Sequence, residues 1–158
     1  MTTGADQTVP PGGDGSAPTP VADLRVHAVP AAPEWLAAVR HALGEWAVRA
    51  GLAADQVADL VQASYEAVAN VIDHAYPDTA GRFDVDAVYE REEQRVTVTV
   101  TDYGRWRAPR PDARSVRGRG LLLIERLAPE FELIPEPGGT QVYLGWPCPI
   151  ATGGGPSR

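Results

Sequence analysis

Two segments near the middle of the chain, residues 82–90 and 95–101, alternate apolar and polar side chains with a period of two. That period is typical of strands with one face buried and the other in water. The charged residues around Arg91 form a turn signal between the segments, so the two strands are expected to pair antiparallel. Such a pair has one apolar face to bury, and helices elsewhere in the chain can cover it.

The other periodic segments supply both helices and strands. The predicted elements are, in chain order, a short strand at 24–29, a helix from Pro33 that ends before Gly51, a helix at about 54–75, the two strands above, a loop at 105–117, a short helix at 120–127, and a hairpin of strands 130–135 and 140–146. This order predicts an α+β fold, a two-layer sandwich in which helices cover one face of a mixed, mostly antiparallel sheet.

The composition of the two ends predicts a single domain between two tails. Residues 1–22 hold many prolines and glycines and almost no large apolar side chains, so we expect a disordered N-terminal tail. Residues 147–158 end in TGGGPSR and are expected to form a flexible C-terminal tail. Residues 23–146 are enough for one hydrophobic core.

The sequence has no apolar run near the ~20 residues that a membrane span needs, and no export-signal pattern at its start. Its single cysteine, Cys148, cannot form an internal disulfide. A cytoplasmic location is therefore expected, with no membrane partner.

Charge excludes several functions. The formal net charge of −7 argues against direct nucleic-acid binding, which depends on positive charge meeting phosphates. All 14 basic residues are arginine. Without lysine, the chain lacks the P-loop lysine and the strand lysine of the protein-kinase fold. A chain of this composition that handles ATP must use another design.

The second predicted helix carries a polar stripe. Within YEAVANVIDHAY, the residues Glu66, Asn70 and His74 recur every four positions, although Asn is a mediocre helix former. One reading is an ordinary solvated face. The other is a ligand-facing stripe, with Glu66 as a base or water-positioning carboxylate and Asn70 as a neutral oxygen ligand to Mg²⁺. The helix alone leaves both readings open.

Two glycine signals follow downstream. The strand at 95–101 runs into Asp102-Tyr103-Gly104, which is either an ordinary turn or a site where an ionised Asp accepts a hydrogen bond from a ring amine such as that of adenine. Gly118-Arg119-Gly120-Leu121 then precedes a helix, where exposed N–H groups favour anions. Six arginines gather at 105–119, for which phosphates or an acidic protein surface are suitable partners.

The order of these motifs resembles the Bergerat-type ATP-binding fold of the GHKL superfamily. Within it, the chain is most similar to the anti-sigma-factor serine kinases, the histidine-kinase-like ATPases that act on sigma regulation. The resemblance covers residues 23 to about 146. Its motifs are EAVANVIDHAY for the Asn-bearing helix, VTDYG and GRGLLLIERL for the two glycine boxes, and GGTQVYL for the closing strand.

The resemblance implies a role for each matched residue. Glu66 would be the general base, and Asn70 would ligate Mg²⁺ bridging the ATP phosphates. Asp102 would bind the adenine amine, Gly104 would give the ring room, and Thr140 would support adenine from the sheet. The segment of Gly118, Arg119, Gly120 and Leu121 would bring backbone N–H groups to the phosphates. The implied cofactors are ATP and Mg²⁺.

The resemblance also implies an activity and partners. The chain is expected to phosphorylate a serine on an anti-anti-sigma (STAS-type) protein and to sequester a sigma factor, and related proteins often form homodimers. No phosphoacceptor-helix region is visible, so His74 is not expected to be phosphorylated. Here Gly104 is followed by Arg105 and Trp106 where the family often has a second glycine. This departure keeps an alternative open, a kinase-inactive, partner-switching binding module of the same fold.

Overall fold

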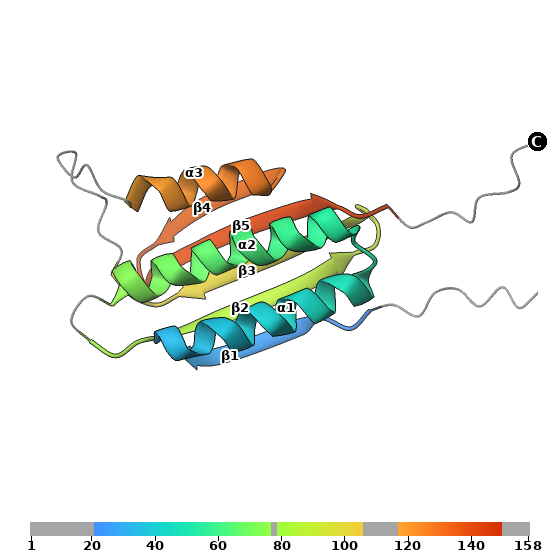
Figure 1. Ribbon diagram of the computed structural model, residues 1–158. Helices are drawn as coiled ribbons and strands as arrows, with labels where there is room; N and C mark the ends of the chain where they lie inside the picture. Colours follow the sequence, from blue (N-terminus) through green and yellow to red (C-terminus); the bar gives the residue numbers. More distant parts are fainter. Residues whose placement is uncertain (1–20, 77–78, 106–116, 150–158) are drawn as a thin grey trace, which may run out of the picture.

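The computed structural model describes residues 21–76, 79–105 and 117–149. These residues form a layer of helices on one face of a five-stranded sheet (Figure 1). The strands are β1 (Leu24–Pro30), β2 (Arg82–Glu90), β3 (Arg95–Asp102), β4 (Glu130–Glu136) and β5 (Gly139–Pro147), in the spatial order β1-β2-β3-β5-β4. The expected α+β two-layer fold is confirmed. The sequence suggested a mixed sheet, and the four pairings of the described strands are all antiparallel.

The period-two pattern of β2 and β3 gives the predicted antiparallel pair with one buried face. The strands pair along their whole lengths, from Phe83 opposite Asp102 to Glu90 opposite Arg95. The alternate residues that face the helices are fully buried, namely Phe83, Val85 and Ala87 on β2 and Val96, Val98 and Val100 on β3. Because side chains of a strand alternate between faces, this register leaves the polar residues on the uncovered face.

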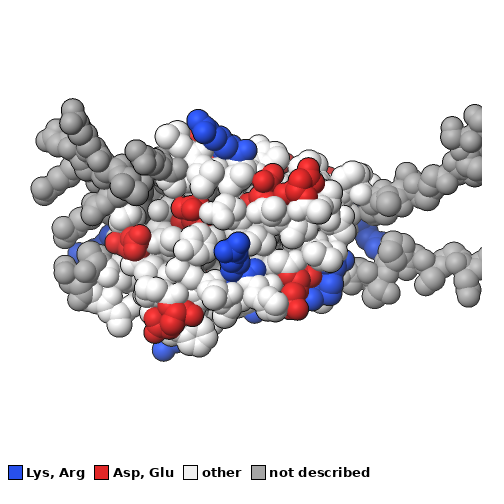
Figure 2. Space-filling view, in the orientation of Figure 1, with Lys and Arg blue, Asp and Glu red and all other residues white. Residues whose placement is uncertain are grey.

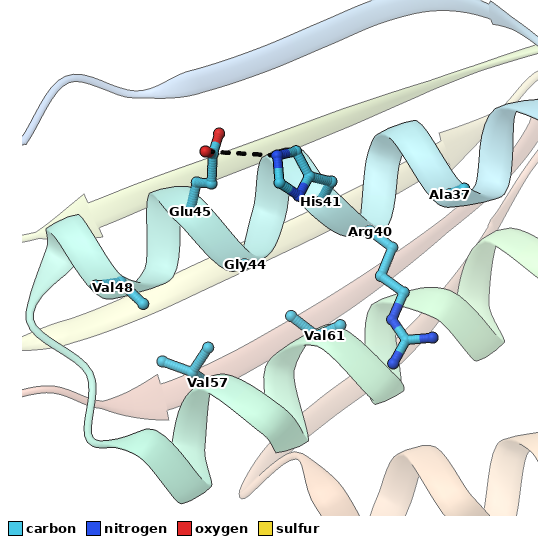
Figure 3. Close-up of a pocket in the computed structure, with 8 residues that line it drawn as sticks. All are labelled: Ala37, Arg40, His41, Gly44, Glu45, Val48, Val57 and Val61. Carbon is cyan, nitrogen blue, oxygen red and sulfur yellow. Dashed lines mark ion pairs between the residues drawn. The ribbon is translucent and has the colours of Figure 1, made fainter.

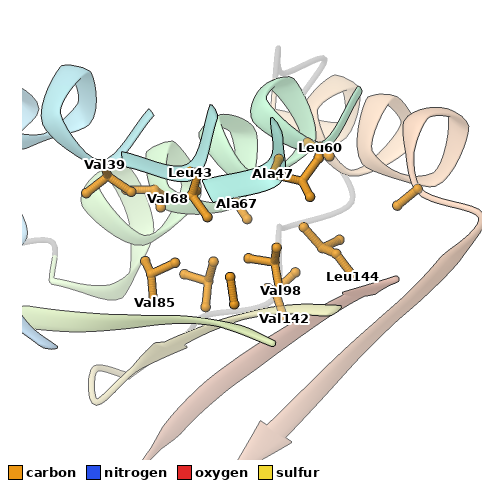
Figure 4. Packing of buried hydrophobic residues seen from close by; sticks show 14 of the residues in the cluster. Val39, Leu43, Ala47, Leu60, Ala67, Val68, Val85, Val98, Val142 and Leu144 are labelled. Carbon is orange, nitrogen blue, oxygen red and sulfur yellow. The ribbon is translucent and has the colours of Figure 1, made fainter. Parts of the chain in front are cut away.

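Helix α1 (Leu36–Ala50) begins after a 3₁₀ turn at Pro33–Trp35, and α2 (Ala54–Asn70) follows it after a short loop. The end of α1 before Gly51 is confirmed, because Gly51 adopts a left-handed φ of 93° that favours glycine. Both helices bury apolar stripes against β2, β3 and β5 (Figure 4). The labelled side chains are Val39, Leu43, Ala47, Leu60, Ala67, Val68, Val85, Val98, Val142 and Leu144.

The second helix changes geometry at Asn70. Its expected span to residue 75 is present, but Val71–Ala75 form a wider π-helical turn, η2. Such π turns are rare and often occur at functional sites. The wider turn sets the position of the helix end, and therefore of Ala75 and Tyr76, relative to the sheet.

Helix α3 (Arg117–Leu127) starts three residues before the expected position at residue 120. Gly118, Arg119 and Gly120 therefore lie inside the first turn of the helix, whereas the sequence suggested that Gly118 and Arg119 precede it. The rest of the predicted arginine-rich loop, residues 106–116, lies outside the described residues.

The folded part reaches slightly beyond 23–146 at both ends. The indole N–H of Trp46 donates a 2.8 Å hydrogen bond to the carbonyl oxygen of Ala22. At the other end, β5 includes Pro147, and Cys148 is buried with its N–H bonded to the Gln94 carbonyl oxygen at 2.7 Å. The remainder of the two predicted tails, residues 1–20 and 150–158, lies outside the described residues. Among the described helices, none is long and apolar enough to cross a membrane.

Candidate functional site

Helices α2 and α3 lie side by side, and the polar stripe of α2 meets the first turn of α3. A Cβ atom placed on Gly120 would stand 3.4 Å from Asn70 Oδ1 and 3.5 Å from Glu66 Oε2. Both side chains therefore point toward the N-terminal end of α3. The solvated-face reading of this stripe does not describe Glu66 and Asn70, because both are partly buried at a helix–helix contact.

Glu66 is oriented by its own helix. Gln62, one turn earlier, donates a 2.9 Å hydrogen bond from Nε2 to Glu66 Oε1. The other carboxylate oxygen, Oε2, is the one near Gly120. A helix N-terminus carries partial positive charge, so a carboxylate, or an anionic ligand beside it, is stabilised there. Gln62 was not predicted as a site residue, although its spacing of four residues from Glu66 was the available signal.

A second group of predicted residues lies where β3 ends. Asp102 is opposite Thr140 on β5, and each is only 4% exposed. The Asp102 carboxylate accepts hydrogen bonds from the N–H of Gly104, at 3.0 Å, and from the N–H of Thr140. Burial raises the pKa of Asp102 above its usual value, and the two hydrogen bonds oppose that rise.

Thr140 leaves a hydrogen-bonding group without a partner. Its hydroxyl oxygen is buried and bonds to no group within the described part of the chain. Buried polar atoms are nearly always satisfied, so an unpartnered hydroxyl beside a buried carboxylate points to a polar ligand or a bound water at this position. The donor and acceptor set fits the edge of a nucleobase, because Asp102 accepts and Thr140 can donate or accept.

Two glycines are required here by close backbone contact. A Cβ on Gly104 would stand 2.2 Å from the carbonyl oxygen of Ala75 at the end of η2. A Cβ on Gly139 would stand 1.9 Å from the carbonyl oxygen of Asp102. Neither position accommodates a side chain without a backbone shift. Gly104 therefore lets the residues after Asp102 lie directly against the end of the helix that carries Asn70.

The structure places eight of the nine predicted site residues in two groups, one at each end of η2. The first group lies at α2 and α3 and the second at β3 and β5. The first comprises Glu66, Asn70, Gly118, Arg119 and Gly120, and the second comprises Asp102, Gly104 and Thr140. Leu121 packs against the hydrophobic core. The described residues contain no cluster of three or more His, Cys, Asp or Glu side chains, so a cation here would take few ligands from the protein.

A described pocket lies elsewhere, in a groove of about 570 Å³ between α1 and α2 (Figure 3). Its lining comprises Ala37, Arg40, His41, Gly44, Glu45, Val48, Val57 and Val61. Val57 and Val61 lie on the side of α2 away from Glu66 and Asn70, so this groove is separate from both groups. On the helix-covered face, acidic and basic side chains are interspersed, and the described residues form no continuous basic patch there (Figure 2).

The chain matches a known class of ATP-binding domain in sequence and fold. A family model described as a histidine kinase-like ATPase domain matches residues 29–146, and the chain therefore belongs to that family. Membership of an ATPase family makes a nucleotide the expected ligand.

Among curated proteins, the chain is similar to serine-protein kinase RsbW of Staphylococcus aureus. The two are 29% identical over 126 residues, which cover 71% of this chain and 79% of the relative. RsbW of Bacillus thuringiensis (strain Al Hakam) is also 29% identical over 126 residues, with 71% and 78% covered.

Two solved structures agree with the fold. The crystal structure of the RsbU and RsbW domains of Rv1364c from Mycobacterium tuberculosis superposes with a TM-score of 0.62 at 26% identity, over 83% of this chain. The match covers 35% of that longer chain. The histidine kinase domain from the Erythrobacter litoralis EL346 blue-light activated histidine kinase matches with a TM-score of 0.50 at 18% identity, covering 72% of this chain and 59% of that one. The second likeness shows the fold alone.

Proposed function

We propose that this chain is an ATP-dependent serine-protein kinase that regulates a sigma factor. Its curated relatives are named serine-protein kinases, and a solved relative contains an RsbW domain. The observation that carries the proposal is the meeting of Glu66 and Asn70 with the first turn of α3. A carboxylate, an amide oxygen and a helix N-terminus at one place can supply a base, a magnesium ligand and an anion site for phosphoryl transfer from ATP.

Asp102 and Thr140 are proposed to bind adenine. The ionised Asp102 carboxylate accepts a hydrogen bond from the exocyclic amine, and the Thr140 hydroxyl supplies the second polar contact, directly or through water. The rigid hydrogen bonds that Asp102 accepts from Gly104 and Thr140 hold its carboxylate in place before the ligand binds. Gly104 keeps the chain after Asp102 against Ala75, with no side chain between them.

Asn70 and the first turn of α3 are proposed to hold the phosphates. The first N–H groups of α3, among them those of Gly118 and Arg119, have no partner within the helix and attract anions; Gly120 and Leu121 follow inside the helix. The amide oxygen of Asn70 fits Mg²⁺, a hard cation that takes most of its ligands from phosphate and water. When bound, Mg²⁺ would neutralise charge on the phosphates as it develops.

Glu66 is proposed as the general base. The serine hydroxyl of a partner protein gives its proton to Glu66 while its oxygen forms a bond to the γ-phosphorus. The bond from the γ-phosphorus to the bridging oxygen of ADP breaks at the same time, and ADP leaves with that electron pair. Gln62 holds one carboxylate oxygen and directs the other toward the phosphate end of the site.

The acceptor is proposed to be a serine on an anti-anti-sigma protein of the STAS type, and a sigma factor is proposed as the second partner. Phosphorylation of the first would release the kinase to sequester the second. A kinase with these partners would act in the cytoplasm, and that is the location we propose. No part of this proposal needs contact with nucleic acid, which suits the net charge of −7.

The test separates binding from transfer. Calorimetry with Mg-ATP should show binding to wild type and to Glu66→Gln, and a ~10–100-fold weaker affinity for Asp102→Asn, because a charge-assisted hydrogen bond is lost. With radiolabelled ATP and a candidate anti-anti-sigma protein, Glu66→Gln should transfer phosphate about 10²–10⁴-fold more slowly. Glu132→Gln, an exposed change on β4, is the matched control.

The same measurements distinguish the kinase from the alternative function, a partner-switching binding module. Wild-type protein that binds ATP but transfers no phosphate to any candidate serine would be a binding module. Wild-type protein that binds no nucleotide would refute the proposal altogether. Normal transfer by Glu66→Gln would remove Glu66 from the role of base and leave the nucleotide site intact.

A further inference from the structure

Tyr76 follows η2 and bonds to the backbone at the start of β2 and just after the end of β3, six and 27 residues later in the sequence. Its hydroxyl donates a hydrogen bond to the carbonyl oxygen of Arg82 at the start of β2. The same hydroxyl accepts a 2.9 Å hydrogen bond from the N–H of Tyr103, the residue after Asp102. One phenol oxygen therefore connects the end of η2, the start of β2 and the end of β3.

The Tyr76 ring can pack against the backbone of Gly81 because Gly81 has no side chain. A Cβ on Gly81 would stand 2.2 Å from the ring carbons of Tyr76. The ring thus lies directly on the backbone just before β2, and its hydroxyl reaches past that backbone to Arg82 and Tyr103. The aromatic ring has few rotatable bonds, so its hydroxyl is held at a defined point.

The neighbouring residue, Ala75, also bonds to the segment that follows Asp102. The N–H of Arg105 donates a 3.2 Å hydrogen bond to the Ala75 carbonyl oxygen. Carbonyl groups at a helix end lack partners in the helix, so this one is available. The three N–H groups after Asp102 are then all committed: Tyr103 to Tyr76, Gly104 to the Asp102 carboxylate, and Arg105 to Ala75.

The side chain of Tyr103 bonds on the face of the sheet that the helices leave uncovered. Its hydroxyl donates to Asp84 Oδ2, and Asp84 Oδ1 accepts a 2.6 Å hydrogen bond from the N–H of Ala28. Burial acts to raise the pKa of Asp84, but the bonds from Tyr103 and Ala28 and the nearby His27 outweigh it, so the net shift is downward. Tyr103 is thus held at both its backbone and its side chain.

We infer that Tyr76 is a positioning residue for the nucleotide site: its hydroxyl fixes the backbone after Asp102, and so fixes the carboxylate that is to receive the base. The inference rests on the proposed role of Asp102. Tyr76 is the last residue of the motif YEAVANVIDHAY, and the sequence alone predicted no role for it at the nucleotide site. Without the Tyr76 hydroxyl, the Tyr103 N–H loses its partner and the turn that carries the Gly104 bond to Asp102 loses one of its two attachments to the helix.

The test is Tyr76→Phe, with Tyr89→Phe as the matched control. Tyr89 also donates a hydrogen bond to a backbone carbonyl, that of Cys148 at 3.2 Å, but it lies at the opposite end of β2. Tyr76→Phe should raise the KM and Kd for Mg-ATP by about 5–10-fold, the effect of one net hydrogen bond. The transfer rate at saturating ATP should stay within about twofold of wild type. Tyr89→Phe should change neither constant.

A second measurement, amide hydrogen exchange in protein without nucleotide, reports on the hydrogen bond from the Tyr103 N–H to the Tyr76 hydroxyl. The Tyr103 amide should exchange with solvent deuterium faster in Tyr76→Phe than in wild type, and at the wild-type rate in Tyr89→Phe. A general loss of stability would instead lower the transfer rate at saturating ATP without a specific rise in KM.

The outcomes separate this inference from the proposed function. If wild type binds Mg-ATP and Tyr76→Phe binds it equally well, or protects the Tyr103 amide equally well, the inference is refuted and the nucleotide site stands. If wild type binds no Mg-ATP, the proposed function is refuted and Tyr76 has no base to position.

Discussion

Gly139 offers the sharpest test of the geometry at the end of β3. A Cβ added there would stand 1.9 Å from the carbonyl oxygen of Asp102, 2.8 Å from its carbonyl carbon and 2.9 Å from Tyr103 Cα. All three are backbone atoms, which cannot rotate away as a flexible side chain would. Gly139→Ala should therefore force the start of β5 away from the end of β3, where Thr140 bonds to Asp102.

The size of the effect follows from these distances. The added methyl would be about 1.5 Å closer than the ordinary contact that begins at 3.4 Å. Overpacking of this kind typically costs 1–3 kcal/mol, and loss of the terminal Thr140 hydrogen bond adds to it. We expect a total of about 3 kcal/mol, which in a domain of this size lowers Tm by roughly 9–15 °C. A displaced Asp102 should also weaken ATP affinity by about tenfold or more.

The adjacent glycine supplies the control. Gly138 is exposed, and a Cβ on it would have no atom within 4 Å. Gly138→Ala should therefore unfold within about 2 °C of wild type, since surface changes usually stay within ±0.5 kcal/mol. Calorimetric scans of the three proteins, followed by Mg-ATP titrations, measure both effects. Equal Tm and equal affinity for Gly139→Ala and Gly138→Ala would refute the close contact between β5 and Asp102.

Three further predictions concern Gly120, Asp102 and Cys148. Gly120→Ala places a methyl at ordinary contact distance, 3.4 Å from Asn70 Oδ1, so Tm should stay the same or rise because Ala is the better helix former. Phosphate transfer should fall, because the methyl occupies the space facing Glu66. A rise in Tm with unchanged transfer would contradict the phosphate site. Because burial raises the pKa of Asp102 and protonation removes the charge that strengthens its hydrogen bond from the adenine amine, affinity for Mg-ATP should fall with falling pH more steeply in wild type than in Asp102→Asn, as calorimetry at each pH would show. Cys148 is 4% exposed and burial raises its thiol pKa, so a thiol reagent should modify it slowly in native protein and quickly in denaturant, and fast modification of native protein would show that its end of the fold opens.

The sequence predicted those elements whose patterns depend on local backbone geometry. The period of two fixed the pairing face of β2 and β3, and the left-handed conformation at Gly51 ended α1 where expected. Glu66 and Asn70 lie four residues apart, so helix geometry alone put them on one side of α2. Motif order then indicated the ATPase family, which the family match bears out.

Other features of the site depend on segments that are far apart along the chain. The start of α3 differed from expectation because Gly118 and Gly120 are poor local signals for a helix, and α3 is stabilised by packing against α2 and the core. The role of Tyr76 was not predictable, since its partners Arg82 and Tyr103 are brought to it only by the folded sheet.

The sequence by itself thus determined the elements, the face each one buries and the chemical types available to the site, because periodicity and side-chain chemistry are properties of short segments. Tertiary structure decided which backbone atoms touch: Gly104 against Ala75, and Gly139 against Asp102. The first contact depends on how the helix end packs on the twisted sheet, and the second on the pairing of β3 with β5; close packing allows almost no shift in either.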